Sequence, residues 1–221
     1  MAQQQERARR TRAAIVQSAA AEFGRCGYAA ASLSQILEGS NATKGAMYFH
    51  FDSKEDLARA VMQTAMARYG ETAERWLARD DLDPLEKLYG LTDEIVVRFQ
   101  DDVVVQADFR LAIEPAFVVE GRSGAGVHWA RHVYRLAVEA HERGELREDV
   151  DPGKFARTLG ASMTGQWYMA ELLGEREQLR EHCQYSMASA LEAAATSSWL
   201  ERFHGEGWRA RAQVNGFDTS A

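Results

Sequence analysis

The chain has 221 residues and a formal net charge of −7. Its length and its 46% of apolar residues are enough for one or two domains with hydrophobic cores. Its apolar runs are too short for a membrane span and its first residues, MAQQQERARR, lack a signal-peptide core, so the sequence predicts a cytoplasmic protein. Only 3 prolines and long stretches of apolar residues at helical spacing predict an all-α fold. Cys26 and Cys183 are expected to be ordinary reduced thiols.

The first three predicted helices are short and closely spaced. The first covers about residues 11–26 and ends at Gly27, where a left-handed cap is expected. A Ser-x-x-Gln capping box at Ser32 opens the second, and Asn41 suits the left-handed turn that follows it. Thr43 can then cap a very short third helix. Helix, tight turn and short helix together predict a helix-turn-helix.

Longer helices are predicted after this head. Ser53-x-x-Asp56, Asp83-Pro84 and Asp151-Pro152 mark helix starts, and a glycine-containing loop is expected at 115–126. From residue 199 the sequence predicts a loosely held tail. The longer helices should cover about residues 53–79, 83–99, 102–114, 127–143, 151–173 and 175–195. Tyr69 belongs to the apolar stripe of the first of these helices, and Thr92 belongs to that of the second.

The charges are unevenly distributed between the head and the rest of the chain. Residues 1–60 hold 8 Lys/Arg against 6 Asp/Glu, and the remaining 161 residues hold 18 against 27. A mildly basic head on an acidic body can contact phosphate locally, while the body repels it. This asymmetry is weak evidence for a nucleic-acid partner on its own.

The third helix carries the residue types that read DNA. Lys44 can donate to guanine or phosphate, Gly45 allows a close backbone approach, and Ala46 can offer a methyl group to thymine. Tyr48 and His50 have donors suited to phosphate. Three residues at helix starts should also contact phosphate: Ser32, Thr43 and Lys54.

Several residues of the head have a structural interpretation beside the DNA-binding one. Tyr48 and Phe49 can be core residues, with Phe49 expected to be partly so, and His50 can be a core histidine. The basic residues before the first helix form either a DNA-contacting arm or a solvated tail. They are Arg7, Arg9, Arg10 and Arg12.

The middle of the chain predicts a sensor for a small molecule. Its large aromatic residues do not form one stripe, which suits the wall of a pocket. Any one of them can equally be a core residue. Polar residues lie among them on otherwise apolar faces, including Gln63, Gln106 and Thr164, and burying such groups unpaired costs about 1–3 kcal/mol each. An apolar pocket with a few oriented donors suits a small lipophilic ligand. His128 and His132 share a helical face, but nothing completes a metal-ligand set, so no metal or other cofactor is expected.

The last two long helices are expected to form a dimer. Small residues such as Gly160 and Gly165 permit close helix approach, and an apolar stripe follows the final helix. That stripe can instead pack within one subunit. A dimer would place two heads on half-sites about one helical turn (~34 Å) apart. The stripe consists of Leu179, Cys183, Met187, Ala190 and Ala194.

The head resembles the DNA-binding region of TetR-family transcriptional repressors. The resemblance covers about residues 9–60 and rests on Phe23, Gly27-Tyr28 and the segments 43–51 and 53–57. It departs from the family at the turn, where Ser40-Asn41-Ala42 replaces Ala-Gly-Val. The resemblance implies double-stranded operator DNA and a small-molecule effector as partners of a homodimer.

Within that family the chain is most similar to the γ-butyrolactone receptor subgroup of actinomycetes. The carrying features are the head variant with Phe49, the segment 105–111 and Trp129. Such receptors release DNA on binding a lactone or butenolide and derepress antibiotic biosynthesis. By position, Trp129 would cover the lactone or its acyl chain. The resemblance and the aromatic residues together give a predicted ligand site of Gln63, Gln106, Phe109, Trp129, Thr164 and Tyr168.

The sequence therefore predicts a ligand-responsive repressor that is not an enzyme. Residues 1–52 should form the arm and helix-turn-helix, 53–198 the ligand-binding and dimerisation domain, and 199–221 a flexible tail. The helix starting at Ser53 should act as a lever between ligand and DNA. Two alternatives remain: an enzyme or carrier using the helical body, and a TetR-type repressor of an efflux or metabolic gene responding to another lipophilic ligand.

Overall fold

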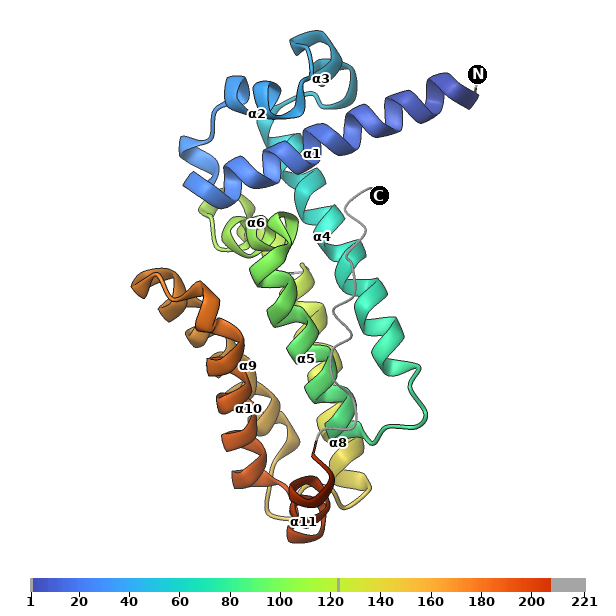
Figure 1. Ribbon diagram of the computed structural model, residues 1–221, viewed down its shortest axis with the longest axis vertical. Coiled ribbons are helices and arrows are strands. Elements are labelled where there is room, and N and C mark those ends of the chain that lie inside the picture. The colour runs from blue at the N-terminus through green and yellow to red at the C-terminus, as the bar shows by residue number, and fades with distance from the viewer. Residues whose placement is uncertain (1, 123, 208–221) are drawn as a thin grey trace. The chain divides into compact units, whose positions relative to one another are not determined.

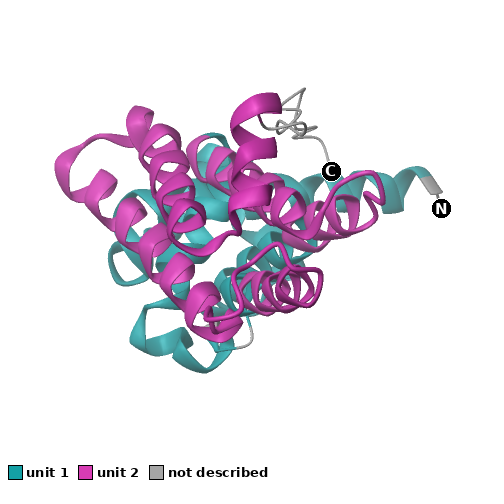
Figure 2. Ribbon diagram, turned by 90° about the horizontal axis from the view of Figure 1, so that it is seen from below, with its two compact units in different colours: residues 1–68, 101–127, 217–221 teal, residues 69–100, 128–216 magenta. Residues whose placement is uncertain are grey.

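The computed structural model describes residues 2–122 and 124–207, and it confirms the predicted all-α fold (Figure 1). The β-pairing seen in the described residues is one isolated bridge between Leu146 and Ala195. The contacts divide the chain into two compact units (Figure 2). Unit 1 holds the described residues up to 68 and 101–127, and unit 2 holds 69–100 and those from 128 onward. The predicted domains divide the chain at residue 52. In the structure, residues 53–68 and 101–127 belong to the same unit as the head.

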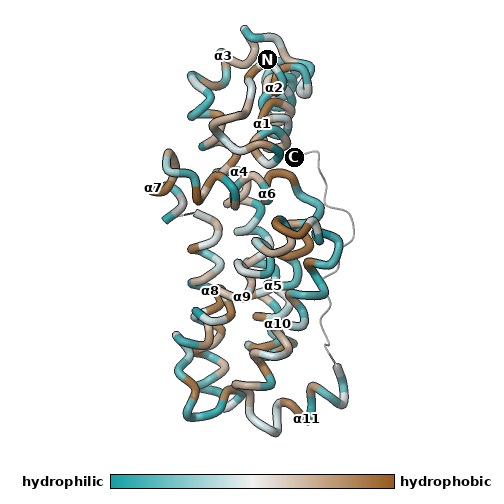
Figure 3. The backbone as a smooth tube through the Cα atoms, turned by 90° about the vertical axis from the view of Figure 1, so that its left-hand side faces the viewer, coloured by the Kyte–Doolittle hydropathy of each residue, from teal (hydrophilic) through white to brown (hydrophobic). Residues whose placement is uncertain are grey.

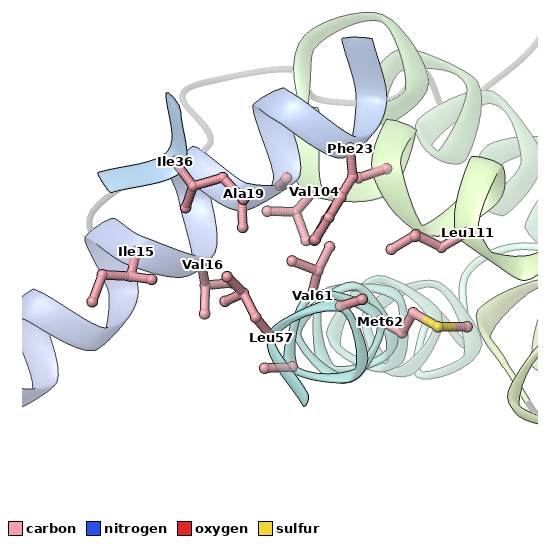
Figure 4. Close-up of a cluster of buried hydrophobic side chains, with 14 of the residues drawn as sticks. Ile15, Val16, Ala19, Phe23, Ile36, Leu57, Val61, Met62, Val104 and Leu111 are labelled. Atoms are coloured by element: carbon pink, nitrogen blue, oxygen red, sulfur yellow. The ribbon is translucent and has the colours of Figure 1, made fainter. Parts of the chain in front are cut away.

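Unit 1 contains the predicted helix-turn-helix. Its elements are α1 (Ala2–Ala30), α2 (Leu33–Ser40), α3 (Lys44–His50), the first part of α4 (Lys54–Leu77), α6 (Val103–Ala112), the 3-10 turn η1 (Pro115–Phe117) and α7 (Val118–Gly121). Side chains from α1, α2, α4 and α6 meet in one core, including Phe23, Ile36, Leu57 and Val104, all fully buried (Figure 4). Burying each large apolar side chain stabilises the fold by about 1.5–3 kcal/mol.

The turn between α2 and α3 has the predicted geometry. Asn41 adopts the left-handed conformation with φ 50°, and the Thr43 hydroxyl accepts a hydrogen bond from the Ala46 amide at 3.1 Å. Ser32 precedes α2 as predicted, but its hydroxyl pairs with that of Ser34 at 2.6 Å and makes no capping bond. The predicted capping box at Ser32 is therefore wrong, while the start of the helix is right.

Helix α1 begins earlier than the sequence pattern predicted. It starts at Ala2 instead of near residue 11, so the arginines of the predicted arm lie on its first turns. The side chains of Glu6 and Arg10, one turn apart, pair at 3.0 Å. Alanine, glutamine, glutamate and arginine all have high helix propensity, which extends a helix even where no apolar stripe marks it. Gly27 breaks helical geometry with φ 79° and ψ 172°, as a glycine there was expected to do.

Within the predicted loop at 115–126, residues 115–121 form a 3-10 turn and a short helix. Phe117 is fully buried, and its ring meets that of Tyr28 edge-on with centroids 4.8 Å apart. Glu114 accepts a hydrogen bond from the Tyr28 amide, and Arg110 donates to the Gly24 carbonyl at 2.8 Å. These contacts tie α6 and the turns after it to α1.

Unit 2 is a helical bundle. It contains the rest of α4, nearly all of α5 (Pro84–Asp101) and α8 (Ala125–Glu142), then α9 (Pro152–Leu173), the 3-10 turn η2 (Arg176–Gln178), α10 (Leu179–Ala194) and α11 (Ser197–Glu206). Hydropathy alternates along most helices, as expected where each buries one face (Figure 3). The main core joins α5, α8, α9 and α10 through Leu88, Leu136, Leu159 and Leu191.

Two helix starts in unit 2 have the predicted caps. Asp83 and Glu86 form a reciprocal capping box, in which each carboxylate accepts the other residue's amide at 2.9 and 3.1 Å. Asp151 accepts the Lys154 amide at 2.8 Å in front of Pro152.

The carboxyl-terminal part of unit 2 corrects two predictions. Residues 197–206 form α11, so the predicted tail from 199 is folded at its start; residues 208–221 lie outside the described residues. Trp199 is 3% exposed and its indole N–H donates to Asp83 at 3.1 Å. The apolar stripe predicted for dimerisation packs inside the subunit instead, since its members at 179, 183, 187 and 194 are buried there.

Candidate DNA-binding surface and effector site

Helix α3 presents a broad exposed face because one side chain anchors it. Met47 is fully buried, and Phe51 just beyond the helix is 2% exposed. Thr43, Lys44 and Gly45 are exposed, and Ala46 is half-buried. A helix of seven residues that buries one of them leaves the others free to enter a DNA groove.

The aromatic residues of α3 also face outward. Tyr48 is 47% exposed, and the Lys44 Nζ lies 5.9 Å from its ring centroid. Phe49 is 79% exposed, so the expectation that it lies partly in the core is wrong. The Phe49 ring meets the half-buried His50 ring edge-on at 4.9 Å. This surface offers one ammonium, one phenol and one imidazole beside an exposed apolar ring.

Lys54 has an internal role that the sequence did not indicate. Its Nζ donates to the carbonyl oxygens of Tyr28 at 2.8 Å, Ala31 at 3.0 Å and Ala29 at 3.4 Å, and lies 4.7 Å from the Tyr28 ring centroid. An ammonium group has three protons, and all three have carbonyl acceptors here. This geometry argues against the predicted phosphate contact by Lys54. Ser32 is half-buried, with its hydroxyl paired to Ser34.

The basic residues at the start of α1 are exposed, and their contact with DNA stays a prediction. Arg7, Arg9 and Arg12 are exposed on its first turns, and the Arg12 guanidinium lies 5.1 Å over the Phe51 ring. Arg10 is paired with Glu6.

The six predicted ligand residues are distributed over both units. In unit 1, Gln63 is exposed on α4, whereas Gln106 and Phe109 are half-buried on α6. In unit 2, Thr164 is exposed and Tyr168 is 60% exposed, both on α9. Their role as one site therefore stays a prediction.

Trp129 has the environment expected of a ligand-binding residue. Its ring is half-buried and lies against Gly160 of α9, where a Cβ atom would come 3.2 Å from the ring carbon Cζ3. Its indole Nε1 is buried and has no hydrogen-bond partner in the described protein. Buried donors without an acceptor are rare in folded proteins, so this nitrogen requires an explanation.

Two further buried polar groups were not predicted from the sequence. The hydroxyls of Tyr69 and Thr92, on α4 and α5, are buried without a partner in the described protein. Both residues fit the apolar stripe of their helix, so periodicity classed them as core. A hydroxyl-bearing residue at an apolar position of each helix was the feature of the sequence that could have indicated these buried polar groups.

The described residues hold no group of three or more histidine, cysteine or acidic side chains arranged to bind a metal ion. Among the same residues, no helix is long and apolar enough to cross a membrane.

Comparison with known proteins matches two family models to the chain. The model of bacterial regulatory proteins of the tetR family covers residues 15–61, and that of the Tetracyclin repressor-like C-terminal domain covers 123–186. The first spans the helix-turn-helix and the start of α4, and the second begins shortly before α8 and ends within α10.

Individual relatives agree with the family models. The A-factor receptor protein of Streptomyces griseus is 33% identical over 178 residues, which are 80% of this chain and only 60% of the receptor's own length. The structure of a gamma-butyrolactone receptor (ArpA-like protein) is 27% identical with a TM-score of 0.71, covering 89% of this chain and 94% of that one. The TetR-family protein CprB from Streptomyces coelicolor, solved with its operator sequence, is 27% identical with a TM-score of 0.76 and the same coverage.

The exposed face of α3 and the left-handed asparagine turn thus lie within the first matched region, and α8 and α9 lie within the second. The relatives are transcriptional regulators and include receptors of the γ-butyrolactone type. The chain belongs to the TetR family of bacterial transcriptional repressors.

Proposed function

We propose that this repressor binds a pseudo-palindromic operator as a homodimer and is released by a small diffusible signal of the lactone or butenolide type. The observation that carries the DNA-binding part is the exposed face of α3. Lys44 and Gly45 lie on that face, and Tyr48 is 47% exposed beside them. The related CprB was solved in complex with its operator, which supports the same role for α3 here.

Each exposed group of α3 has a defined task in this proposal. Lys44 donates to a guanine edge in the major groove, and the Tyr48 hydroxyl donates to a phosphate. Gly45 has no side chain to hold the helix away from the bases. Phe49 adds an apolar contact to sugar or thymine methyl groups, because most of its ring is exposed.

The homodimer is supported by an exposed apolar surface on α9 and α10. Tyr168, Leu172 and Tyr185 are 60%, 65% and 75% exposed, whereas residues of this size normally lie in a core or an interface. The Gln166 side chain donates to the Ser186 hydroxyl at 2.9 Å, which holds these two helices side by side. A second copy packed against this surface would form a four-helix interface.

Release by an effector requires a connection between the body and the head. Helix α4 begins at Lys54 next to α3 and continues to Leu77 in unit 2. We expect effector binding in unit 2 to shift α4 and change the spacing of the two recognition helices. Such couplings typically change affinity about 5- to 150-fold. Similarity to γ-butyrolactone receptors supports a lactone as the effector and antibiotic-biosynthesis genes as targets.

The experiment that tests the proposal begins with operator selection from random DNA duplexes by the full chain. Enrichment of an inverted repeat, with protection of two half-sites about 34 Å or a multiple of this apart, is the expected result. The Lys44→Ala variant serves for comparison and should enrich the repeat less strongly, with a relaxed preference at one base pair of each half-site. Failure of the unaltered chain to enrich any sequence would contradict the proposal.

A further inference from the structure

Three uncharged side chains in unit 2 each have a buried polar atom with no hydrogen-bond partner in the described protein. These atoms are the hydroxyls of Tyr69 and Thr92 and the indole nitrogen of Trp129. Tyr69 and Thr92 are each 4% exposed. An unsatisfied buried polar group costs about 1–3 kcal/mol, and native proteins retain few of them. Three in one bundle, on three different helices, require an explanation.

The contacts of unit 2 connect Trp129 with Tyr69. Trp129 and His132 lie one turn apart on α8, so their side chains are neighbours on its surface. The His132 ring centroid is 6.1 Å from that of Tyr69. The two groups therefore approach each other through His132.

Thr92 approaches the same region from α5. It lies one turn from Leu88 in the main core and one turn from Val96. Val96 belongs to a second cluster of buried side chains, which also contains Ala170, Leu179 and Cys183. Met163 of α9 packs against both clusters, one turn beyond the Gly160 backbone that Trp129 touches. Thr92 thus lies on α5 between residues of the two clusters, and Trp129 packs against the first of these clusters.

The surroundings of Thr92 are electrically balanced. The neighbouring Glu94 accepts from Trp76 at 2.8 Å and pairs with Arg75 at 2.5 Å. Asp93 pairs with Arg180 at 2.7 Å. Because arginines neutralise both carboxylates, this region favours a neutral ligand over a cation.

The His132 ring beside Tyr69 favours its uncharged form. Burial lowers the pKa of His132, and the nearby Arg135 and His128 lower it further, so the imidazole is uncharged at neutral pH. Burial raises the pKa of the Tyr69 phenol, so it keeps its proton and can donate it.

We infer that Tyr69, Thr92 and Trp129 form the polar anchor of the effector site. They hold the acceptor oxygens of a compact, neutral molecule whose hydrocarbon part packs on the apolar side chains nearby. An indole N–H can only donate, so at least one acceptor such as a carbonyl or ester oxygen is required. This inference rests on the proposed function, since it names the chemistry of that repressor's effector. The hydroxyls of Tyr69 and Thr92 add two donors whose ordinary structural partners are missing.

The test is calorimetric titration of the full chain with a synthetic 2-acyl-γ-butyrolactone, without DNA. Thr92→Val and Tyr69→Phe remove one hydroxyl each and keep the shape of the side chain. Each should weaken binding roughly 3- to 15-fold, the range expected for one lost hydrogen bond. Thr64→Val and Tyr134→Phe are matched controls, because the Thr64 hydroxyl bonds within its own helix and Tyr134 is 52% exposed. They should bind the lactone like the unaltered chain.

A second measurement separates an anchor from a structural role. Without lactone, Thr92→Val and Tyr69→Phe should unfold at the same temperature as the unaltered chain or higher, because the lost hydroxyls bond nothing in the protein. Lower unfolding temperatures for both would show that the hydroxyls have permanent partners such as buried water, and would overturn the inference.

Three binding results would also overturn it. They are no binding of the lactone by the unaltered chain, equal binding by the two hydroxyl variants, and equally tight binding of the hydrophobic cation tetraphenylphosphonium. None of these results depends on DNA. Operator selection therefore tests the repressor function separately, and failure of the anchor leaves that function intact.

Discussion

The indole ring of Trp129 on α8 lies against the backbone of Gly160 on α9, where a Cβ atom would come 3.2 Å from the ring carbon Cζ3. Gly160→Ala should therefore push the ring aside by a few tenths of an ångström. We expect a several-fold loss of lactone affinity with little change in unfolding temperature, because the gain in helix propensity, about 0.5–1 kcal/mol, offsets the strained contact. Titration calorimetry and thermal unfolding measure the two effects.

Gly126→Ala is the control, since it lies on the same helix as Trp129 and a Cβ atom there meets nothing within 4 Å. It should leave lactone affinity unchanged. If Gly160→Ala also leaves it unchanged, the position of the Trp129 ring does not matter for the effector.

Lys44→Ala should weaken binding to the selected operator by about 1–3 kcal/mol and relax the preference for one base pair, because a bidentate guanine contact is lost. Tyr48→Phe should weaken all duplexes alike, as expected for a phosphate contact. Fluorescence anisotropy with operator and random duplexes distinguishes the two. Equal losses on both duplexes for Lys44→Ala would make it a phosphate contact too.

Lys54→Met should destabilise the head by about 1–3 kcal/mol, because three carbonyl groups at the end of α1 lose their donor. At temperatures where the head stays folded, the salt dependence of operator binding should not change. A fall in the salt slope by about one would instead show that Lys54 neutralises a phosphate.

The sequence predicted the head well because local chemistry determines it. Asn41 adopts a left-handed turn and the Thr43 hydroxyl caps α3, both from short-range signals. Met47 is fully buried, as one apolar residue in so short a helix must be. It did not predict that Lys54 would cap α1 from more than 20 residues away, because the ends of α1 and α4 meet only in the folded head.

The body was predicted less completely because its remaining features depend on long-range packing. The buried Trp199 reaches Asp83 across 116 residues, and no local pattern marks that contact. Thr92 and Tyr69 sit on apolar stripes, so periodicity identified their burial and not their unpaired hydroxyls. The apolar stripe of α10 was identified correctly, but sequence alone could not decide whether it faces its own subunit or a partner.

Asp108→Asn should stabilise the protein above neutral pH. Burial without a partner for its Oδ1 raises the pKa of the Asp108 carboxyl from 3.8 to about 7. The folded protein thus holds this proton more tightly than the unfolded chain, so the group lowers stability as pH rises from about 4 to about 7. The variant should gain on the order of 4 kcal/mol at pH 8 and little at pH 4. Denaturant unfolding at both values checks this, and an equal effect at both would refute it.

Trp199→Ala should destabilise unit 2 by about 3–5 kcal/mol, because it empties a buried site and removes a donor from the buried Asp83 carboxylate. Glu201→Ala, at an exposed position on the same helix, is the control and should change stability by less than about 0.5 kcal/mol. Loss of stability no greater than in the control would mean that α11 does not support the bundle.

The most direct test of the account measures the affinity of the full chain for its selected operator with and without saturating 2-acyl-γ-butyrolactone, by fluorescence anisotropy. We predict a fall of about 5- to 150-fold with the lactone. We also predict that Thr92→Val shifts the response to higher lactone concentration and leaves the lactone-free operator affinity unchanged. Operator affinity that is the same with and without saturating lactone would contradict the central claim.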